Sequence, residues 1–165
     1  MNRFWLNQLM GEKAILFIAT GFGLGRIPFA PGTFGTIAGL PLIGIMAWLA
    51  TACTPGAAAL FLVGVVLCAV WISQEAEILI GDKDPGAVVI DEMAGFCVTM
   101  TLVPVTMLTL VLGFIAFRCF DILKPFPIRW FEKNFSGGAG IVLDDLMAGV
   151  LAAFLLKAIY LSGLT

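Results

Sequence analysis

The amino-acid sequence predicts an all-α protein embedded in a membrane. We expect a helical bundle of about three to four spans, in which one helix could re-enter or double back near Pro104, and an interfacial helix at the N-terminus. Of the 165 residues, 61% are hydrophobic and only 12% are charged, whereas about 25% of the residues of a soluble domain are charged. Mean hydropathy is +1.06. The length favours one membrane-embedded domain, residues 1–165.

The N-terminal segment is apolar but does not look long enough to cross a bilayer. Asn2–Met10 contains five large apolar side chains and suits a helix lying in the membrane interface. The next apolar stretch, Ala14–Gly25, is too short to span, since a span takes about 20 residues. It could dip into the interface and return.

The longest uncharged run extends from Ile27 to Gln74 and is long enough for two spans. We expect these spans at Gly35–Ala52 and Ala57–Ser73. The break between them contains Pro55 and Gly56, which predict a tight turn.

A second uncharged run, Met93–Phe117, could be one straight span or could double back near Pro104. A straight helix would divide the basic residues almost evenly between the two sides. If the run doubles back, each arm reaches about half the bilayer, because a helix rises ~1.5 Å per residue, and the basic residues share one face. We prefer this version, and the positive-inside rule then makes that face cytoplasmic. The residues on it would be Arg3, Lys13, Arg26, Lys83, Arg118, Lys124, Arg129 and Lys133.

The last apolar run, Leu146–Leu164, contains a single charged residue, Lys157, which can snorkel to the interface.

Several classes of function are excluded by composition. The chain has no histidine, which removes histidine-dependent catalysis and imidazole metal sites. Its net charge of −2 argues against a nucleic-acid partner. The four cysteines form no C-x-x-C pair and are expected to be buried small apolar residues.

The carboxylates are confined to two polar segments. In the first, Asp84 lies in a turn, and Asp91 and Glu92 immediately precede an apolar helix. One carboxylate there would serve as a helix cap, but two adjacent carboxylates repel and imply a cation. Magnesium prefers oxygen ligands and needs no histidine. This segment therefore predicts a metal site.

The second segment repeats the arrangement, with Asp144 and Asp145 just before the helix expected at Leu146–Leu164. The preceding stretch, Ser136–Gly140, is rich in glycine. It could let the backbone approach a phosphate, or it could be a plain linker. Two acidic pairs at two helix starts favour a metal centre more than either pair alone.

Basic residues accompany the second acidic pair. Arg118 and Asp121 are three positions apart and therefore share a helix face, Lys124 lies in the same sector, and Pro125 ends the helix. Two interpretations stay open. The residues could form an interfacial ion pair with a snorkelling lysine, or Arg118 and Lys124 could bind phosphate while Asp121 orients them or binds metal.

A loop rich in proline and glycine lies at the start of the first span and contains Arg26 and Thr33. Its backbone amides and the Thr33 hydroxyl could meet an anionic head group at a helix N-terminus. The Gly35-x-x-x-Gly39 spacing more often indicates close helix packing.

Three ordered segments together carry a resemblance to a known family. They are Pro31-Gly32-Thr33-x-Gly35-Thr36-x-x-Gly39-x-Pro41, then Lys83-Asp84-Pro85-x-x-x-Val89-x-Asp91-Glu92-x-x-Gly95, and finally Phe117-Arg118-x-Phe120-Asp121-x-x-Lys124-Pro125 with Gly138-x-Gly140-Ile-Val-x-Asp144-Asp145. From about Gly21 to its end, the chain resembles phosphatidylglycerophosphatase A. The resemblance implies a magnesium-dependent phosphatase of the bacterial inner membrane that converts phosphatidylglycerophosphate to phosphatidylglycerol and phosphate.

The catalytic routes that the composition leaves available agree with that resemblance. Without histidine or a Cys-x5-Arg loop, the remaining routes are a metal-activated water or an aspartyl nucleophile. We expect magnesium ligands among Asp84, Asp91, Glu92, Asp121, Asp144 and Asp145. We expect catalytic roles for Asp91, Glu92 and Asp145, with Glu92 or Asp145 as the base. We expect phosphate-binding roles for Arg118, Lys124 and Lys83, with Arg26 and Thr33 as weaker candidates.

The expected partners are the lipid substrate and membrane lipids, and the glycine-rich faces would permit a homo-oligomer. The active site would face the cytoplasm, with the acyl chains held among the spans. The alternative is a membrane cation-binding or transport bundle, because acidic residues inside membranes often mark cation paths. Here the carboxylates lie at span ends, which favours an interfacial site.

Overall fold

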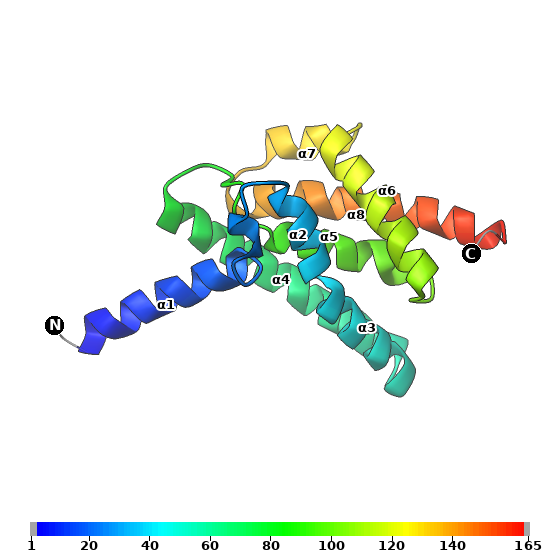
Figure 1. The fold of residues 1–165 in the computed structure, drawn as a ribbon, viewed down its shortest axis with the longest axis horizontal. Helices are drawn as coiled ribbons and strands as arrows, with labels where there is room; N and C mark the ends of the chain where they lie inside the picture. The colour runs from blue at the N-terminus through cyan, green and yellow to red at the C-terminus, as the bar shows by residue number, and fades with distance from the viewer. Residues whose placement is uncertain (1–2, 164–165) are drawn as a thin grey trace.

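A computed structural model of the chain describes residues 3–163, with side chains from residue 11 onward, and within these limits the protein is all-helical, as predicted. Figure 1 shows the helices gathered into a bundle, from which the first helix and the end of the last helix project. In chain order, the elements are α1 (Arg3–Ala19), η1 (Leu24–Arg26), α2 (Pro31–Ala38), α3 (Leu40–Ala52), α4 (Pro55–Ile80), α5 (Ile90–Thr99), η2 (Met100–Leu102), α6 (Met107–Leu123), α7 (Ile128–Asn134) and α8 (Gly137–Leu161).

Within residues 3–163, three segments are long and apolar enough to cross a membrane: Pro31–Ala52, Pro55–Ile80 and Gly137–Leu161. The first joins α2 and α3, whose boundary lies at Gly39. The second begins close to the expected position but continues seven residues beyond Ser73. The prediction of three to four spans is therefore confirmed by length and composition.

The run Met93–Phe117 doubles back near Pro104, as preferred from the sequence. After η2 the backbone becomes extended at Val103, and α6 begins with Thr106 as its N-cap. Thr106 and Thr109 form a capping box, and the Thr109 hydroxyl also donates to the Pro104 carbonyl at 2.7 Å. Figure 1 shows α5 and α6 as two arms, and both pack against α8, the central helix.

The expected start of the last helix is wrong. Instead of beginning at Leu146, α8 begins at Gly137, so Asp144 and Asp145 lie in its third turn and cap nothing. The glycines of the Ser136–Gly140 stretch belong to α8, so this stretch is not a flexible linker. A Cβ on Gly138 would lie 2.1 Å from the Val70 carbonyl oxygen of α4, so this glycine lets two helices pack closely.

The N-terminus also differs from expectation. Helix α1 begins at Arg3 and continues to Ala19, so it joins most of the expected interfacial helix to the apolar stretch that follows. Asn2 lies outside the described residues. A turn with left-handed backbone at Gly21, Phe22 and Gly23 follows. The Val89 N–H donates to the Ala19 carbonyl at 2.9 Å, which ties the end of α1 to the loop before α5. The interfacial position of α1 stays a prediction.

The cysteines are all free, as expected, but only Cys97 is buried. Cys53, Cys68 and Cys119 are exposed on the isolated protein, so the expectation that all four are buried is wrong. An apolar helix that faces lipid leaves small apolar residues on its outside, since a bilayer does not require them to be covered.

Candidate functional site

Three carboxylates from two helices meet at one end of the bundle. Asp91 and Glu92 lie in the first turn of α5, and Asp145 lies in α8. One carboxylate oxygen from each lies within 4.8 Å of the other two. Asp91 and Asp145 are buried, with 7% and 4% of their surface exposed. The two acidic pairs therefore converge, although they lie more than 50 residues apart in the sequence.

Close packing of α5 against α8 brings these carboxylates together. A Cβ on Gly149 would lie 2.3 Å from the Gly95 carbonyl oxygen, and a Cβ on Gly95 would lie 2.7 Å from the Asp145 carbonyl oxygen. Gly95 follows Asp91 by four residues, and Gly149 follows Asp145 by four residues. Residues four apart share a helix face, so the glycine contact places the two aspartates on facing surfaces one turn away.

Gly149 is the positioning residue that the sequence analysis missed. The available signal was its spacing, because an aspartate followed four residues later by glycine occurs at both Asp91 and Asp145. That spacing predicts a helix face carrying a carboxylate beside a close helix contact.

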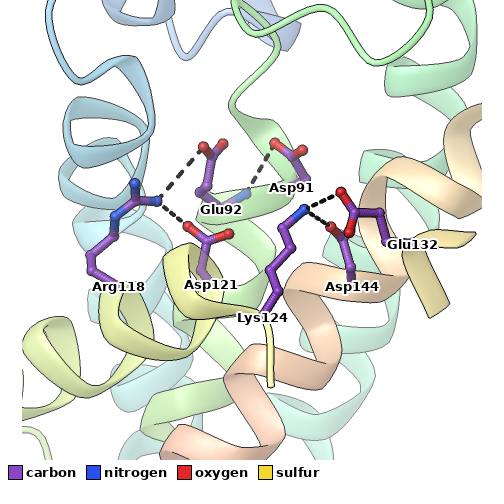
Figure 2. A network of polar contacts seen from close by, with 7 residues as sticks. All are labelled: Asp91, Glu92, Arg118, Asp121, Lys124, Glu132 and Asp144. Carbon is purple, nitrogen blue, oxygen red and sulfur yellow. Dashed lines mark hydrogen bonds and ion pairs between the residues drawn. The ribbon is translucent and has the colours of Figure 1, made fainter. Parts of the chain in front are cut away.

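Arg118 joins the carboxylates of α5 and α6. Its Nη1 atom donates to Asp121 Oδ2 in a short contact, which confirms the predicted shared face, and lies 3.8 Å from Glu92 Oε1 (Figure 2). Helix α2 closes against this pair, since a Cβ on Gly32 would lie 2.2 Å from Glu92 Oε1 and 2.8 Å from Arg118 Nη1. The glycine next to Thr33 is therefore required for α2 to approach the carboxylates.

Lys124 links α6 to α7 and α8. Figure 2 shows its side chain pointing toward two carboxylates: Nζ lies 2.7 Å from Asp144 Oδ2 and 3.0 Å from Glu132 Oε1. Loss of hydration alone would lower the lysine pKa, but these two hydrogen-bonded carboxylates outweigh it, so the pKa of Lys124 is raised. Glu132 was not predicted, because the turn between α6 and α7 breaks any helical periodicity between it and Lys124.

A cavity of about 260 Å³ adjoins Asp144, and the charged residues that line it include Lys83, Asp84, Glu132 and Asp144. Asp84 therefore lies beside the Asp144 side of the cluster and outside the group formed by Asp91, Glu92 and Asp145. The pKa of Asp84 is raised, because surrounding protein removes part of the hydration of its carboxyl even though the residue lies at the surface; Lys124 opposes this shift.

Two other predicted residues lie in η1 and α2. Arg26 is exposed in η1, and its guanidinium forms no ion pair with any side chain between residues 11 and 163. Thr33 lies in the first turn of α2 beside Gly32. Their predicted contact with phosphate stays a prediction, as does that of Lys83.

The cluster has more negative than positive charge. Its carboxylates are Asp91, Glu92, Asp121, Asp144 and Asp145, and its cations are Arg118 and Lys124. Among the described residues, Glu92 Oε2 and Asp144 Oδ1 are buried and accept no hydrogen bond. Buried anions without partners are costly. An all-oxygen donor set with unsatisfied carboxylates therefore fits a hard divalent cation such as magnesium.

Comparison with known proteins agrees with the sequence motifs. The model of the family described as Phosphatidylglycerophosphatase A matches residues 17–160. The chain is 37% identical over 162 residues to the phosphatidylglycerophosphatase A of Haemophilus influenzae (93% of each chain). It is 37% identical over 141 residues to that of Escherichia coli K12 (84% of this chain, 79% of the relative).

A third relative carries a different name. It is a Bacteroides thetaiotaomicron protein described as "Putative phosphatidylinositol-3-phosphatase", 36% identical over 151 residues (86% of this chain, 90% of the relative). No solved structure matches the chain. The family match covers most of the chain and includes every residue of the carboxylate cluster. The chain therefore belongs to the phosphatidylglycerophosphatase A family of phosphatases.

Proposed function

We propose that this protein is a magnesium-dependent phosphatase of phospholipid biosynthesis that converts phosphatidylglycerophosphate to phosphatidylglycerol and phosphate. The observation that carries the proposal is the convergence of Asp91, Glu92 and Asp145 at one end of an apolar helical bundle. Two relatives bear the name of this activity. The comparisons favour a phosphatase over the alternative of a cation-transport bundle.

Asp91, Glu92 and Asp145 would hold the magnesium ion, with Asp144 and Asp84 as further candidates. The bound ion would neutralise phosphoryl oxygens and lower the pKa of a water molecule. Glu92 or Asp145 would accept the proton of the attacking water.

The basic residues would bind the phosphate and orient the carboxylates. Arg118 is fixed between Asp121 and Glu92, and its buried Nε–H group donates to no acceptor among the described residues. A guanidinium held in this way has N–H groups left for a phosphate oxygen. Lys124 holds Asp144 in place through its hydrogen bond and adds positive charge beside the centre.

We further propose that the protein lies in the bacterial inner membrane with this site at the cytoplasmic face. Lys83, Arg118, Lys124, Arg129 and Lys133 belong to the loops and helix ends around the site, and basic residues favour the cytoplasmic side. A cysteine replacing Ser136 should react with membrane-impermeant thiol reagents only from the cytoplasmic side, once the exposed native cysteines are replaced. Reaction from the periplasmic side would contradict this orientation.

Phosphate release by the purified protein tests the activity. We expect release from phosphatidylglycerophosphate in neutral detergent with magnesium, its loss in EDTA, and its recovery when magnesium is added in excess. Phosphatidate and phosphatidylinositol 3-phosphate, the latter chosen because of the name of the third relative, should be hydrolysed more slowly. Release that survives EDTA would contradict the metal requirement, and faster release from either other lipid would contradict the assigned substrate.

A further inference from the structure

A second cavity, which is basic, is lined in part by Lys124. It has a volume of about 460 Å³ and is formed by the end of α6, the following turn and α7. Among the side chains that the structure describes, Lys124, Arg129 and Lys133 are the cations that line it, and no carboxylate does. Lys124 therefore belongs to two sites of opposite charge: the carboxylate cluster, which is mainly negative, and this basic cavity.

Arg129 and Lys133 are available for an anionic ligand. They lie four residues apart on α7, which places them on one helix face, and both are exposed. Neither forms an ion pair with any carboxylate whose side chain the structure describes. Lys124, in contrast, is already held by Asp144 and Glu132. The two residues of α7 thus carry positive charge that no carboxylate in the described part of the chain pairs with.

The walls of this cavity point to a lipid rather than to a free anion. Phe126, Leu123 and Trp130 also line it, with 84%, 70% and 49% of their surfaces exposed. Exposed aromatic and aliphatic residues next to lysine and arginine are typical of the membrane interface, where Trp rings lie at the level of the head groups. An anion bound here would have apolar groups beside it, as the phosphate of a phospholipid has.

Because Lys124 contacts both sites, a lipid with two phosphate groups could occupy the carboxylate cluster and the basic cavity together. Lys124 lines the basic cavity and donates a 2.7 Å hydrogen bond to Asp144 of the carboxylate cluster, so one side chain contacts both sites. A lipid whose phosphate monoester reaches the acidic centre could place a neighbouring phosphodiester in the basic cavity. Phosphatidylglycerophosphate has both groups, joined by a single glycerol, whereas phosphatidate has the monoester alone.

We propose that Arg129 and Lys133 bind the phosphodiester of the substrate lipid and thereby select lipids that carry a phosphodiester beside the phosphate monoester. The inference rests on the proposed function and adds a determinant of specificity to it. The two residues do not touch the bond that is cleaved, so they act on substrate binding and on selectivity.

The test compares two substrates in neutral detergent micelles that contain no other anionic lipid. In the R129Q/K133Q variant we expect the KM for phosphatidylglycerophosphate to rise about tenfold, with little change in kcat, because charge-assisted contacts to the phosphate are lost. The kinetic constants for phosphatidate should stay unchanged. The difference between variant and wild type should shrink at high salt, since exposed charges are screened.

Two further variants serve as controls. R129K/K133R keeps both charges and should retain the preference for phosphatidylglycerophosphate. K13Q/K157Q removes two charges from α1 and α8, away from the cavity, and should behave as wild type. An equal loss in K13Q/K157Q would show that only overall charge matters and would overturn the proposal.

The remaining outcomes are also decisive. If R129Q/K133Q loses activity equally on both substrates, the cavity serves a separate bilayer lipid or the stability of the protein, and the proposal is wrong. Unchanged constants on both substrates would also overturn it. If the wild-type protein hydrolyses neither lipid, the proposed function itself fails; if it hydrolyses phosphatidylglycerophosphate without any change in the variant, only this inference fails.

Discussion

Replacing Asp91 or Asp145 by asparagine is expected to reduce phosphate release by about 10²- to 10⁴-fold while leaving the bundle folded. Asparagine keeps the shape of the side chain but removes the negative charge that would hold the cation. Metal ions contribute several kcal/mol to the stabilisation of a transition state, and each 1.36 kcal/mol is a factor of ten in rate. Steady-state kinetics of the purified variants at saturating magnesium measure the effect.

Thermal unfolding separates a loss of metal binding from a loss of structure. Magnesium should raise the Tm of the wild-type protein, because a ligand that binds only the folded state stabilises it. It should not raise the Tm of D91N or D145N. Asp82→Asn, an exposed aspartate in the loop after α4, is the matched control and should keep both responses. Full activity in both D91N and D145N would remove these residues from the chemistry.

Gly149→Ala is expected to have the second-largest effect, although the added methyl group touches no reacting atom. The new Cβ would lie 2.3 Å from the Gly95 carbonyl oxygen and 3.1 Å from the Val98 Cβ, so α8 must move away from α5. Such overpacking costs about 1–3 kcal/mol of stability. A displacement of about 1 Å at a catalytic centre can cost ~10²-fold in rate. Activity and Tm should therefore fall together.

Gly64→Ala is the control for this substitution. Gly64 lies within α4, and a Cβ there meets nothing within 4 Å. Alanine is favoured over glycine inside a helix by roughly 0.5–1 kcal/mol, so G64A should leave activity unchanged and should not lower the Tm. Wild-type activity in G149A would show that the α5–α8 contact does not position the carboxylates.

Much of the fold follows from signals that lie within single segments. Uncharged runs of known length predict the spans, and Pro104 predicts the reversal between α5 and α6, because a proline without an N–H interrupts a helix. The three-residue spacing of Arg118 and Asp121 predicts their contact on one face of α6. Each of these features depends on residues close together in the chain.

The features that the sequence did not predict depend on contacts between helices. Glycine favours both loops and close helix packing, and only the backbone of α4 next to Gly138 shows that packing is the reason in α8. The partnership of Lys124 with Glu132 depends on how the chain turns between α6 and α7. The convergence of Asp91 with Asp145 was expected from their chemistry, but the glycine contact that places them was not.

The central claim is that carboxylates of α5 and α8 share a divalent cation. It is tested most directly by determining an experimental structure with manganese in place of magnesium and locating the ion by its anomalous scattering. We predict one strong peak bound by oxygens of Asp91, Glu92 and Asp145. A protein that is active with manganese but shows its peak away from these three side chains, or that holds Asp91 and Asp145 too far apart to share an ion, would contradict the account.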